Sequence, residues 1–222
     1  MADDSLVDSH AGLRITEIFY SLQGETRTVG LPTVFVRLTG CPLRCGYCDT
    51  VYAFTGGTRM NFSDILDKVG EFEPKYVTVT GGEPLAQPAC LPLLNHLCDQ
   101  NYQVSLETSG ALDISKVDSR VAIVLDLKTP ASGEENQNLY ENIEYLRSKD
   151  TVKFVLCDRS DYEWSRNKLN QFNIGQTCEV LFSPVNPGLN ATALAQWILD
   201  DRLPVRLQLQ VHKLLWGNVP GR

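Results

Sequence analysis

The chain has 222 residues, enough for one large domain and too few for two comfortable ones, and its 43% hydrophobic and 21% charged residues are close to the globular average. These values argue against a disordered chain, and no apolar run approaches the length that a membrane span needs. The net charge of −7 disfavours non-specific binding to nucleic acid or anionic lipid, so we expect a small-molecule partner. Residues 1–5 are acidic where a signal peptide would be basic, which favours a cytoplasmic protein.

Strand and helix patterns alternate along the chain, after a flexible leader at residues 1–12 that shows no periodicity. We expect residues 13–222 to form a single domain. Strands are predicted at 13–19, 33–38, 76–80, 104–107, 121–127, 152–157, 179–182 and 205–211. Helices are predicted after an N-cap at Ser63, around Leu91 to Cys98, along Leu139, Ile143 and Leu146, over 161–172, and after an N-cap at Asn190.

The buried, β-branched strands call for parallel pairing under covering helices, in a doubly wound sheet or in a full or partial barrel. The unusual sequences all follow the carboxyl ends of predicted strands, at 41–48, 81–84, 108–110, 128–130 and 183–188. Barrels build their sites from successive loops at that end. The sequence therefore favours an α/β fold with parallel strands in a partial or modified (β/α) barrel.

The seven cysteines fall into two groups. Three are spaced CxxxCxxC, and Pro42 and Gly46 between them indicate a loop wrapped around a bound group rather than one helix face. These three are Cys41, Cys45 and Cys48. The scattered Cys90, Cys98, Cys157 and Cys178 lie in apolar segments, and we interpret them as small buried hydrophobic residues.

Three thiolates without a nearby fourth ligand predict a metal site with an open coordination position. Thiolates suit iron–sulfur clusters or zinc, and a cubane held by three of them leaves one iron free to bind substrate or cofactor. The alternative is a zinc knuckle completed by a distant residue such as His96 or Cys98. Tyr47 lies between two of the ligands, where its ring could flank a group on the open iron or simply pack.

Residues 81–84 (GGEP) form a second signal at a strand end. The two glycines would expose backbone groups to a ligand, and Glu83 could form an inward salt bridge or accept from a cationic amine. A plain tight turn is the alternative. Beside an open iron, this turn fits a cofactor that carries an amine.

Together, the CxxxCxxC loop after a strand, the aromatic residue between its last two cysteines and the downstream GGEP resemble the radical S-adenosylmethionine superfamily. Five segments narrow the resemblance to the family of 7-carboxy-7-deazaguanine synthases. They are 19–25 (FYSLQGE), 34–50 (VFVRLTGCPLRCGYCDT), 80–84 (TGGEP), 107–110 (ETSG) and 210–213 (QVHK).

The resemblance implies an incomplete (β/α) barrel that converts 6-carboxy-5,6,7,8-tetrahydropterin to 7-carboxy-7-deazaguanine with loss of ammonia, a step toward queuosine and related deazapurines. It implies a 4Fe–4S cluster whose unique iron chelates S-adenosylmethionine, and reductive cleavage of that cofactor to a 5′-deoxyadenosyl radical. It also implies Mg²⁺, a homodimer and an electron donor such as flavodoxin or ferredoxin, with no nucleic-acid or membrane partner.

By motif position, the resemblance assigns contacts to individual residues. The S-adenosylmethionine contacts are Tyr47, Asp49, Gly82, Asp126, Leu127, Lys128, Ser183, Pro184, Val185 and Asn186. The substrate contacts are Leu22, Gln23, Gly24, Glu25, Arg37 and Thr80, and Thr50 is the magnesium ligand. The family more commonly has Ser-Pro-Lys at 126–128 and Gln-Pro at 183–184.

Arg37 has a physical reason of its own, because an unpaired cation in a buried strand would be costly. A bidentate substrate carboxylate would satisfy it, and a structural salt bridge is the alternative. His212 and Lys213 are expected to end the last strand, with residues 216–222 folding back over the barrel mouth. The role of His212 stays open.

Two other functions remain possible at this level. A glycyl-radical activating enzyme would share the cluster loop, but it would lack the segments at 19–25 and 210–213. A zinc-stabilised binding module would have no catalysis at all.

Overall fold

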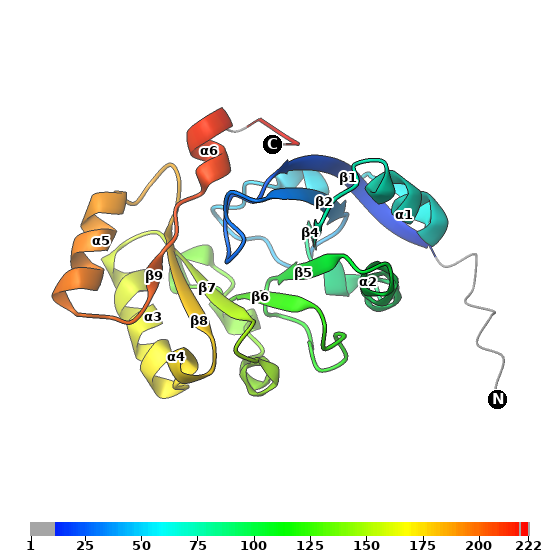
Figure 1. The fold of residues 1–222 in the computed structure, drawn as a ribbon. Helices are drawn as coiled ribbons and strands as arrows, with labels where there is room; N and C mark the ends of the chain where they lie inside the picture. The colour runs from blue at the N-terminus through cyan, green and yellow to red at the C-terminus, as the bar shows by residue number, and fades with distance from the viewer. Residues whose placement is uncertain (1–11, 218, 222) are drawn as a thin grey trace.

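The computed structural model describes residues 12–217 and 219–221, which form one open, curved sheet of nine strands (Figure 1). Residues 1–11 of the predicted leader lie outside the described part, and Gly12 already belongs to the first strand. The strand order is β3-β1-β2-β4-β5-β6-β7-β8-β9. The strands are β1 (Gly12–Leu22), β2 (Pro32–Leu38), β3 (Thr58–Asn61), β4 (Tyr76–Gly81), β5 (Gln103–Thr108), β6 (Ala122–Asp126), β7 (Thr151–Leu156), β8 (Glu179–Pro184) and β9 (Arg206–Leu207).

The strand pairs that link β2 to β9 through β4 are all parallel and the sheet is not closed, which confirms the predicted α/β fold with parallel strands in a partial barrel. The exception is β1, which is antiparallel to both β2 and β3. Residues 23–31 between β1 and β2 are too few for the crossover that a parallel pair requires, so this connection makes a hairpin.

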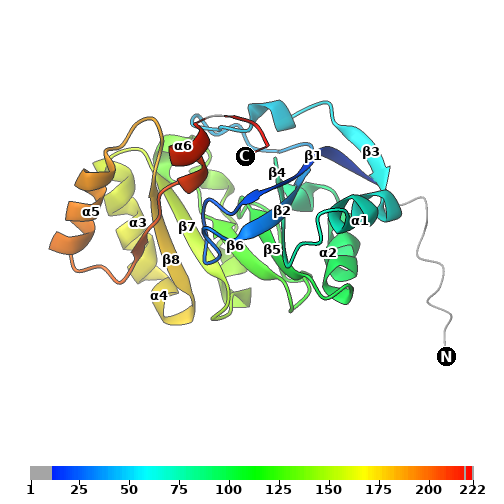
Figure 2. The same ribbon diagram turned by 45° about the horizontal axis from the view of Figure 1, so that its top comes forward.

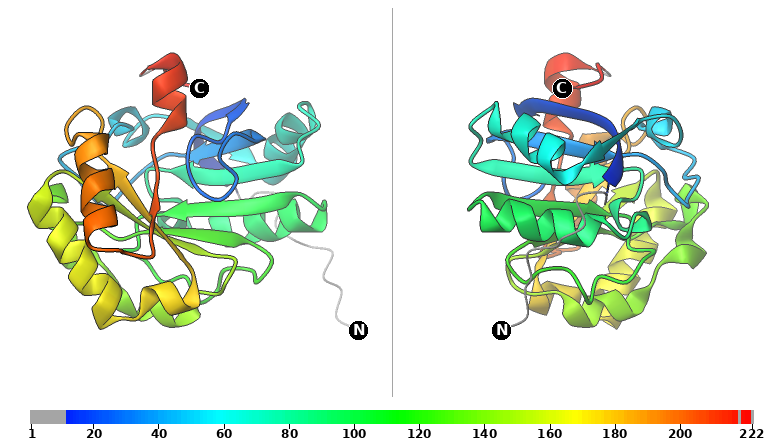
Figure 3. Two further views of the ribbon diagram at one scale, coloured as in Figure 1. Left: turned by 60° about the vertical axis from the view of Figure 1, so that its left-hand side comes forward. Right: turned by 90° about the vertical axis from the view of Figure 1, so that its right-hand side faces the viewer.

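The helices are α1 (Phe62–Gly70), α2 (Cys90–Asp99), α3 (Arg159–Gln171), α4 (Ile174–Thr177), α5 (Ala191–Asp200) and α6 (Val211–Trp216). Two groups of helices cover the outer face of the sheet, α1 with α2 and α3 with α4 and α5, whereas α6 lies apart from both groups (Figures 1 and 3). Asn190 caps α5 as predicted, because its side chain accepts from the Ala193 amide. The N-cap of α1 is Asn61 and not the predicted Ser63, since Asn61 accepts from the Asp64 amide.

The helix predicted along Leu139, Ile143 and Leu146 is wrong. This segment forms a 3-10 turn, η5 (Tyr140–Tyr145), and another 3-10 turn, η4 (Glu135–Gln137), precedes it. The reason is Asn142, whose side chain is fully buried and bonds three backbone groups, namely Gly110 O, Leu112 O and Ile114 N. Those bonds tie the turn to a neighbouring loop, and the apolar spacing could not reveal them.

The prediction of a long last strand at 205–211 is also wrong. The strand β9 is only two residues long, and His212 and Lys213 lie on α6. The chain leaves the sheet after the Gln208 amide donates to Phe182 O. The Val211 amide then donates to Gly24 O, which draws the chain toward the β1–β2 connection. Figure 2 shows α6 apart from the other helices, above the sheet.

Two hydrophobic clusters form the core. One joins α1 and α2 to β1, β2, β4 and β5, and the other joins α3, α4 and α5 to β6, β7 and β8. Cys90, Cys98 and Cys178 are buried as expected, whereas Cys157 is partly exposed at the end of β7. No helix within the described residues is both long and apolar enough to span a membrane.

Candidate active site

A cavity of about 640 Å³ opens at the carboxyl ends of the parallel strands. Most of the predicted contacts line it, although they come from segments far apart in the sequence. They are Leu22, Gln23, Gly24, Glu25, Arg37, Cys41, Cys45, Tyr47, Cys48, Asp49, Thr50, Thr80, Gly82, Asp126, Lys128, Val185 and Asn186. Three predicted contacts, Leu127, Ser183 and Pro184, are buried and do not line the cavity. Leu127 belongs to the second hydrophobic cluster.

The three-cysteine loop follows β2 directly and is held by backbone hydrogen bonds. The Cys48 amide donates to Cys45 O at 3.1 Å, and the Gly46 amide donates to Ser132 O at 3.0 Å. Arg44 donates to Cys41 O at 2.7 Å, and its guanidinium lies 4.3 Å from the centre of the Phe54 ring. Backbone groups therefore position most of the loop, and the one side-chain contact of a thiol among the described hydrogen bonds is that of Cys48 Sγ with Thr50 Oγ1 at 3.7 Å.

Partial burial raises the pKa of the Cys41 and Cys45 thiols, and the nearby Lys128 ammonium opposes that shift. Among the described residues, no three His, Cys, Asp or Glu side chains converge on one ion position. A 4Fe–4S cluster does not need such convergence, because each thiolate binds a different iron. Three soft donors on one cavity wall fit a cluster of this kind.

Neither residue suggested to complete a zinc knuckle reaches the cavity. Cys98 is 7% exposed within the first hydrophobic cluster. His96 packs against Phe62, with ring centres 5.4 Å apart. Both lie on α2, so the zinc knuckle built on either residue is wrong.

The two glycines of the GGEP turn let it approach the cysteine loop. A Cβ atom on Gly82 would lie 2.8 Å from Cys41 Cβ and would also overlap Gly40, so no larger residue fits. The Gly82 amide donates to Leu38 O at 3.1 Å, and the Glu83 amide donates to Gly40 O at 2.8 Å. These hydrogen bonds of the turn stabilise the start of the three-cysteine loop.

Glu83 turns inward, but its partners are neutral groups and not a cation. The side chain is fully buried and accepts from Leu85 N, Thr108 Oγ1, Ser109 N and Ser109 Oγ. It does not line the cavity. Glu83 therefore ties the loop after β4 to the loop after β5, and the alternative that it accepts from a cofactor amine is wrong.

The turn after β1 forms the opposite wall. Gln23 donates to Thr78 Oγ1 at 3.1 Å and accepts from the Glu25 amide at 3.1 Å. Gln210 donates to the Glu25 carboxylate at 2.8 Å. A Cβ on Gly24 would lie 2.8 Å from His212 Cγ, so glycine is needed for α6 to cover this turn.

Arg37 makes a structural salt bridge, the alternative to a substrate carboxylate, through Nε to Glu17 Oε1 at 2.7 Å. Tyr52 donates to the same oxygen at 2.8 Å. Within the described residues, no hydrogen bond or ion pair engages the two terminal nitrogens of Arg37, which lines the cavity. A ligand carboxylate could therefore bind there without breaking the salt bridge.

Sequence reasoning missed two buried ionisable residues in the wall, Lys153 and Glu107. Lys153 forms ion pairs with Glu25 at 2.8 Å and Asp126 at 3.3 Å, and Lys128 pairs with the same Asp126 oxygen at 3.2 Å. Glu107 accepts from Thr80 Oγ1 at 3.0 Å, and burial raises its pKa. The signal was a lone lysine inside the apolar run 152–156, where an unpaired charge would be costly.

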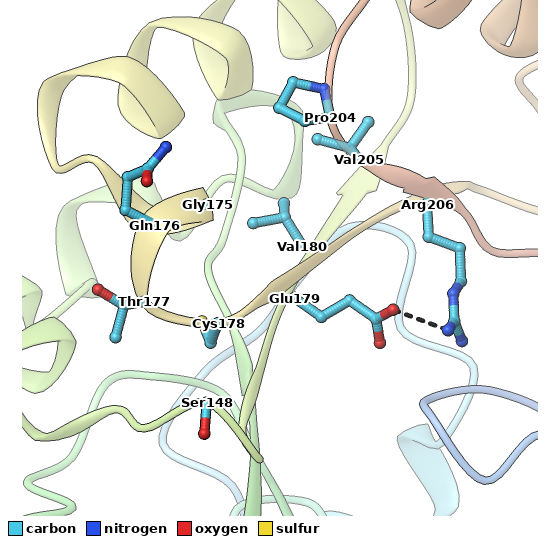
Figure 4. A pocket seen from close by; sticks show the side chains of 10 residues that line it. All are labelled: Ser148, Gly175, Gln176, Thr177, Cys178, Glu179, Val180, Pro204, Val205 and Arg206. Carbon is cyan, nitrogen blue, oxygen red and sulfur yellow. Dashed lines mark ion pairs between the residues drawn. The ribbon is translucent and has the colours of Figure 1, made fainter.

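A second hollow of about 510 Å³ lies at the start of β8, where Glu179 pairs with Arg206 at 2.7 Å (Figure 4). Its lining mixes polar residues such as Gln176 and Thr177 with apolar ones such as Val180. None of the predicted site residues lines it.

Residues 35–130 match the Radical SAM superfamily. The crystal structure of QueE from Escherichia coli superposes with a TM-score of 0.77 at 24% identity, covering 96% of this chain and all of that one. Streptococcus suis SuiB bound to its precursor peptide SuiA gives a TM-score of 0.59 at 15% identity, covering 77% of this chain and 46% of that one. At sequence identities of 24% and 15%, these two structural matches show a similarity of fold only. The superfamily match and the three-cysteine loop at the end of β2 define a radical S-adenosylmethionine enzyme.

Similarity to curated proteins narrows the class. A 7-carboxy-7-deazaguanine synthase of Chlorobaculum tepidum is 42% identical over 95% of this chain and 97% of its own length. The enzyme of the same name from Koribacter versatilis is 40% identical over 92% of this chain and 97% of its own length. The chain belongs to the 7-carboxy-7-deazaguanine synthase family.

Proposed function

We propose that the chain converts 6-carboxy-5,6,7,8-tetrahydropterin to 7-carboxy-7-deazaguanine with release of ammonia, on the path to queuosine and related 7-deazapurines. One observation carries the proposal. A single cavity brings the three cysteines together with the turn at 22–25, Arg37 and Thr80, which are the residues expected to hold the cluster and the pterin.

Cys41, Cys45 and Cys48 would hold the 4Fe–4S cluster. The wall beside them, with Tyr47, Asp49, Gly82, Asp126 and Lys128, would hold S-adenosylmethionine. When bound, cluster and cofactor supply the radical that begins the reaction. Two buried polar atoms here have no protein partner within the described residues, Tyr47 OH and Asp126 Oδ1. Such atoms favour a ligand that can hydrogen-bond to them.

The opposite wall suits a pterin that carries a carboxylate. Burial would raise the pKa of Glu25, but the Lys153 ammonium and hydrogen bonds from Lys153 and Gln210 lower it to about 2. Glu25 is therefore ionised at neutral pH and can accept from the amine and ring N–H of an aminopyrimidinone. The terminal nitrogens of Arg37 offer a bidentate site for the substrate carboxylate.

We further propose Thr50 as a magnesium ligand, because a hydroxyl beside the cavity suits the sparse protein ligation that Mg²⁺ accepts. The family resemblance also supports flavodoxin or ferredoxin as electron donor and a homodimeric enzyme in the cytoplasm.

The test is anaerobic turnover of the reconstituted protein with reductant, S-adenosylmethionine, Mg²⁺ and 6-carboxytetrahydropterin, followed by mass detection of 7-carboxy-7-deazaguanine. Cys45→Ala should remove the brown colour of the cluster and all products, whereas Cys157→Ala should keep both. Formation of 5′-deoxyadenosine without the deazaguanine would contradict the substrate assignment. A colourless native protein that binds zinc would contradict the whole proposal.

A further inference from the structure

Lys153 occupies an unusual position between the two halves of the cavity. It projects from β7, and its Nζ lies 2.8 Å from Glu25 Oε2 on the substrate side and 3.3 Å from Asp126 Oδ2 on the cofactor side. Its side chain is 13% exposed, and those of Glu25 and Asp126 are 13% and 16% exposed. One buried cation therefore bonds a carboxylate in each predicted subsite.

The surrounding carboxylates stabilise the charged form of Lys153, and Glu25 depends on this lysine for its ion pair. Burial alone would lower the pKa of Lys153, but the carboxylates of Glu25, Asp126 and Glu107 raise it well above its usual range. Asp126 has a second cation in Lys128. Glu25 has no other lysine or arginine partner among the described residues, and its remaining polar neighbours include Gln210, His212 and the buried carboxyl of Glu107. Burial lowers the pKa of His212, so this imidazole is largely neutral at pH 7.

We propose that Lys153 is a positioning residue that keeps Glu25 ionised and oriented toward the pterin while its second bond orients Asp126 beside the cofactor. The inference rests on the proposed function, because it takes Glu25 to be a substrate contact. Each carboxylate has one oxygen on Lys153, so this side chain contributes to the orientation of both. Asp126 Oδ1 has no hydrogen-bond partner among the residues that the structure describes, so it is available to a ligand donor.

The removal of this charge has a specific consequence. Without Lys153, burial dominates at Glu25 and moves its pKa upward toward neutrality. A protonated Glu25 loses an acceptor that the pterin needs. Substrate binding should then depend on pH in a range where the native protein shows no dependence.

The experiment measures the dissociation constant of 6-carboxytetrahydropterin at pH 6, 7 and 8 under anaerobic conditions, with reconstituted native protein and the Lys153→Met variant. Lys153→Gln is measured in parallel, because it removes the charge and keeps a hydrogen-bond donor in the buried site. Arg166→Met is the matched control, since it breaks the ion pair between Arg166 on α3 and Asp201 at the end of α5, away from the cavity.

Native protein and the Arg166→Met control should bind the pterin with the same affinity, within about twofold, across this pH range. Lys153→Met and Lys153→Gln should bind it more weakly at pH 8 and lose about another tenfold by pH 6. Adding Glu25→Gln to Lys153→Met should remove most of the pH dependence, because Glu25 no longer titrates and the other neighbouring carboxyl, Glu107, keeps its bond from Thr80 in both variants.

A loss of affinity that is equal at all three pH values in both Lys153 variants would overturn the proposal and leave Lys153 a structural residue. Retention of the pH dependence in the double variant would do the same. Native protein that binds S-adenosylmethionine but no pterin would contradict the proposed function instead, so the two failures are distinguishable.

Discussion

Single buried carboxylates organise this site at the scale of the residue. Glu83 accepts from hydroxyl and amide donors of Thr108 and Ser109, and it thereby joins two loops that border the cavity. Glu25 accepts from a lysine and a glutamine on two distant segments. Such contacts are costly to break, because a buried donor or acceptor that loses its partner carries its full desolvation penalty.

Glu83→Gln should lower the free energy of unfolding by about 3 kcal/mol, because the amide would direct an N–H toward donors that need an acceptor. Urea denaturation of the ligand-free protein measures the loss. Glu163→Gln is the control: its carboxylate is 52% exposed and forms a surface pair with Arg159, so its loss should be within about 0.5 kcal/mol. Equal losses in the two variants would contradict the role of Glu83.

Glu25 should make the free energy of unfolding depend on pH in the acidic range. Its pKa is about 2 in the folded protein against the ordinary 4.5, so its stabilisation is fully present above pH 4.5 and is lost as pH falls toward 2. The unfolding free energies of native protein and Glu25→Gln should differ by about 3 kcal/mol at pH 7 and by much less at pH 2.5. Denaturation at both pH values tests this, and a constant difference would rule it out.

At the scale of the element, α6 acts as a strap over the site. Lys213 pairs with Asp49 at 2.6 Å on the cofactor side, and the Val211 amide bonds Gly24 O on the substrate side. Its outward residues Leu214 and Leu215 are 66% and 55% exposed, so few apolar contacts hold it. The strap depends on these polar links and on the close fit to Gly24.

Gly24→Ala should therefore loosen α6, because the new Cβ would overlap the His212 ring. Hydrogen exchange should become at least about tenfold faster across 211–216, since the loss of the docked state exposes those amides. The double variant Gly24→Ala/His212→Ala should restore slower exchange by removing the ring. Gly175→Ala is the control, because a Cβ there meets nothing closer than 3.7 Å. Failure of the double variant to recover would place the cause elsewhere.

At the scale of the whole molecule, one sheet joins two hydrophobic clusters and carries the cavity across both. Arg37, Thr80 and the cysteine loop come from the half built on β2 and β4, whereas Asp126, Lys153 and Val185 come from the half built on β6, β7 and β8. The clusters meet where β5 pairs with β6, and both contact Leu85 and Val117. The site can form only when both halves are folded.

Phe154→Ala should test this dependence. Phe154 is fully buried on β7, with ring centres 5.6 Å from Phe182 and 6.2 Å from Trp164, so its truncation should cost about 3 to 5 kcal/mol. We expect a single unfolding transition at lower temperature in calorimetry, because the continuous sheet couples the halves. Two separate transitions would show that the clusters unfold independently. Leu199→Ala, at a 70% exposed position, is the control and should change little.

The sequence by itself determined the features that depend on local order along the chain. The β-branched runs predicted the parallel strands, and the CxxxCxxC spacing with the GGEP turn predicted a cluster loop beside a cofactor site. These predictions are possible because strand periodicity and short motifs are each contained within a few consecutive residues.

Only the tertiary structure decided the rest, because it depends on contacts between distant segments. The 3-10 turn around Asn142 and the helix at 211–216 both follow from bonds to residues far away in the sequence. The inward direction of Glu83 and the placing of Lys153 between Glu25 and Asp126 have the same origin. The position of a residue in the sequence pattern shows which face of a helix or strand its side chain occupies. Its partners from distant segments decide whether that side chain binds a ligand or stabilises the structure around the cavity.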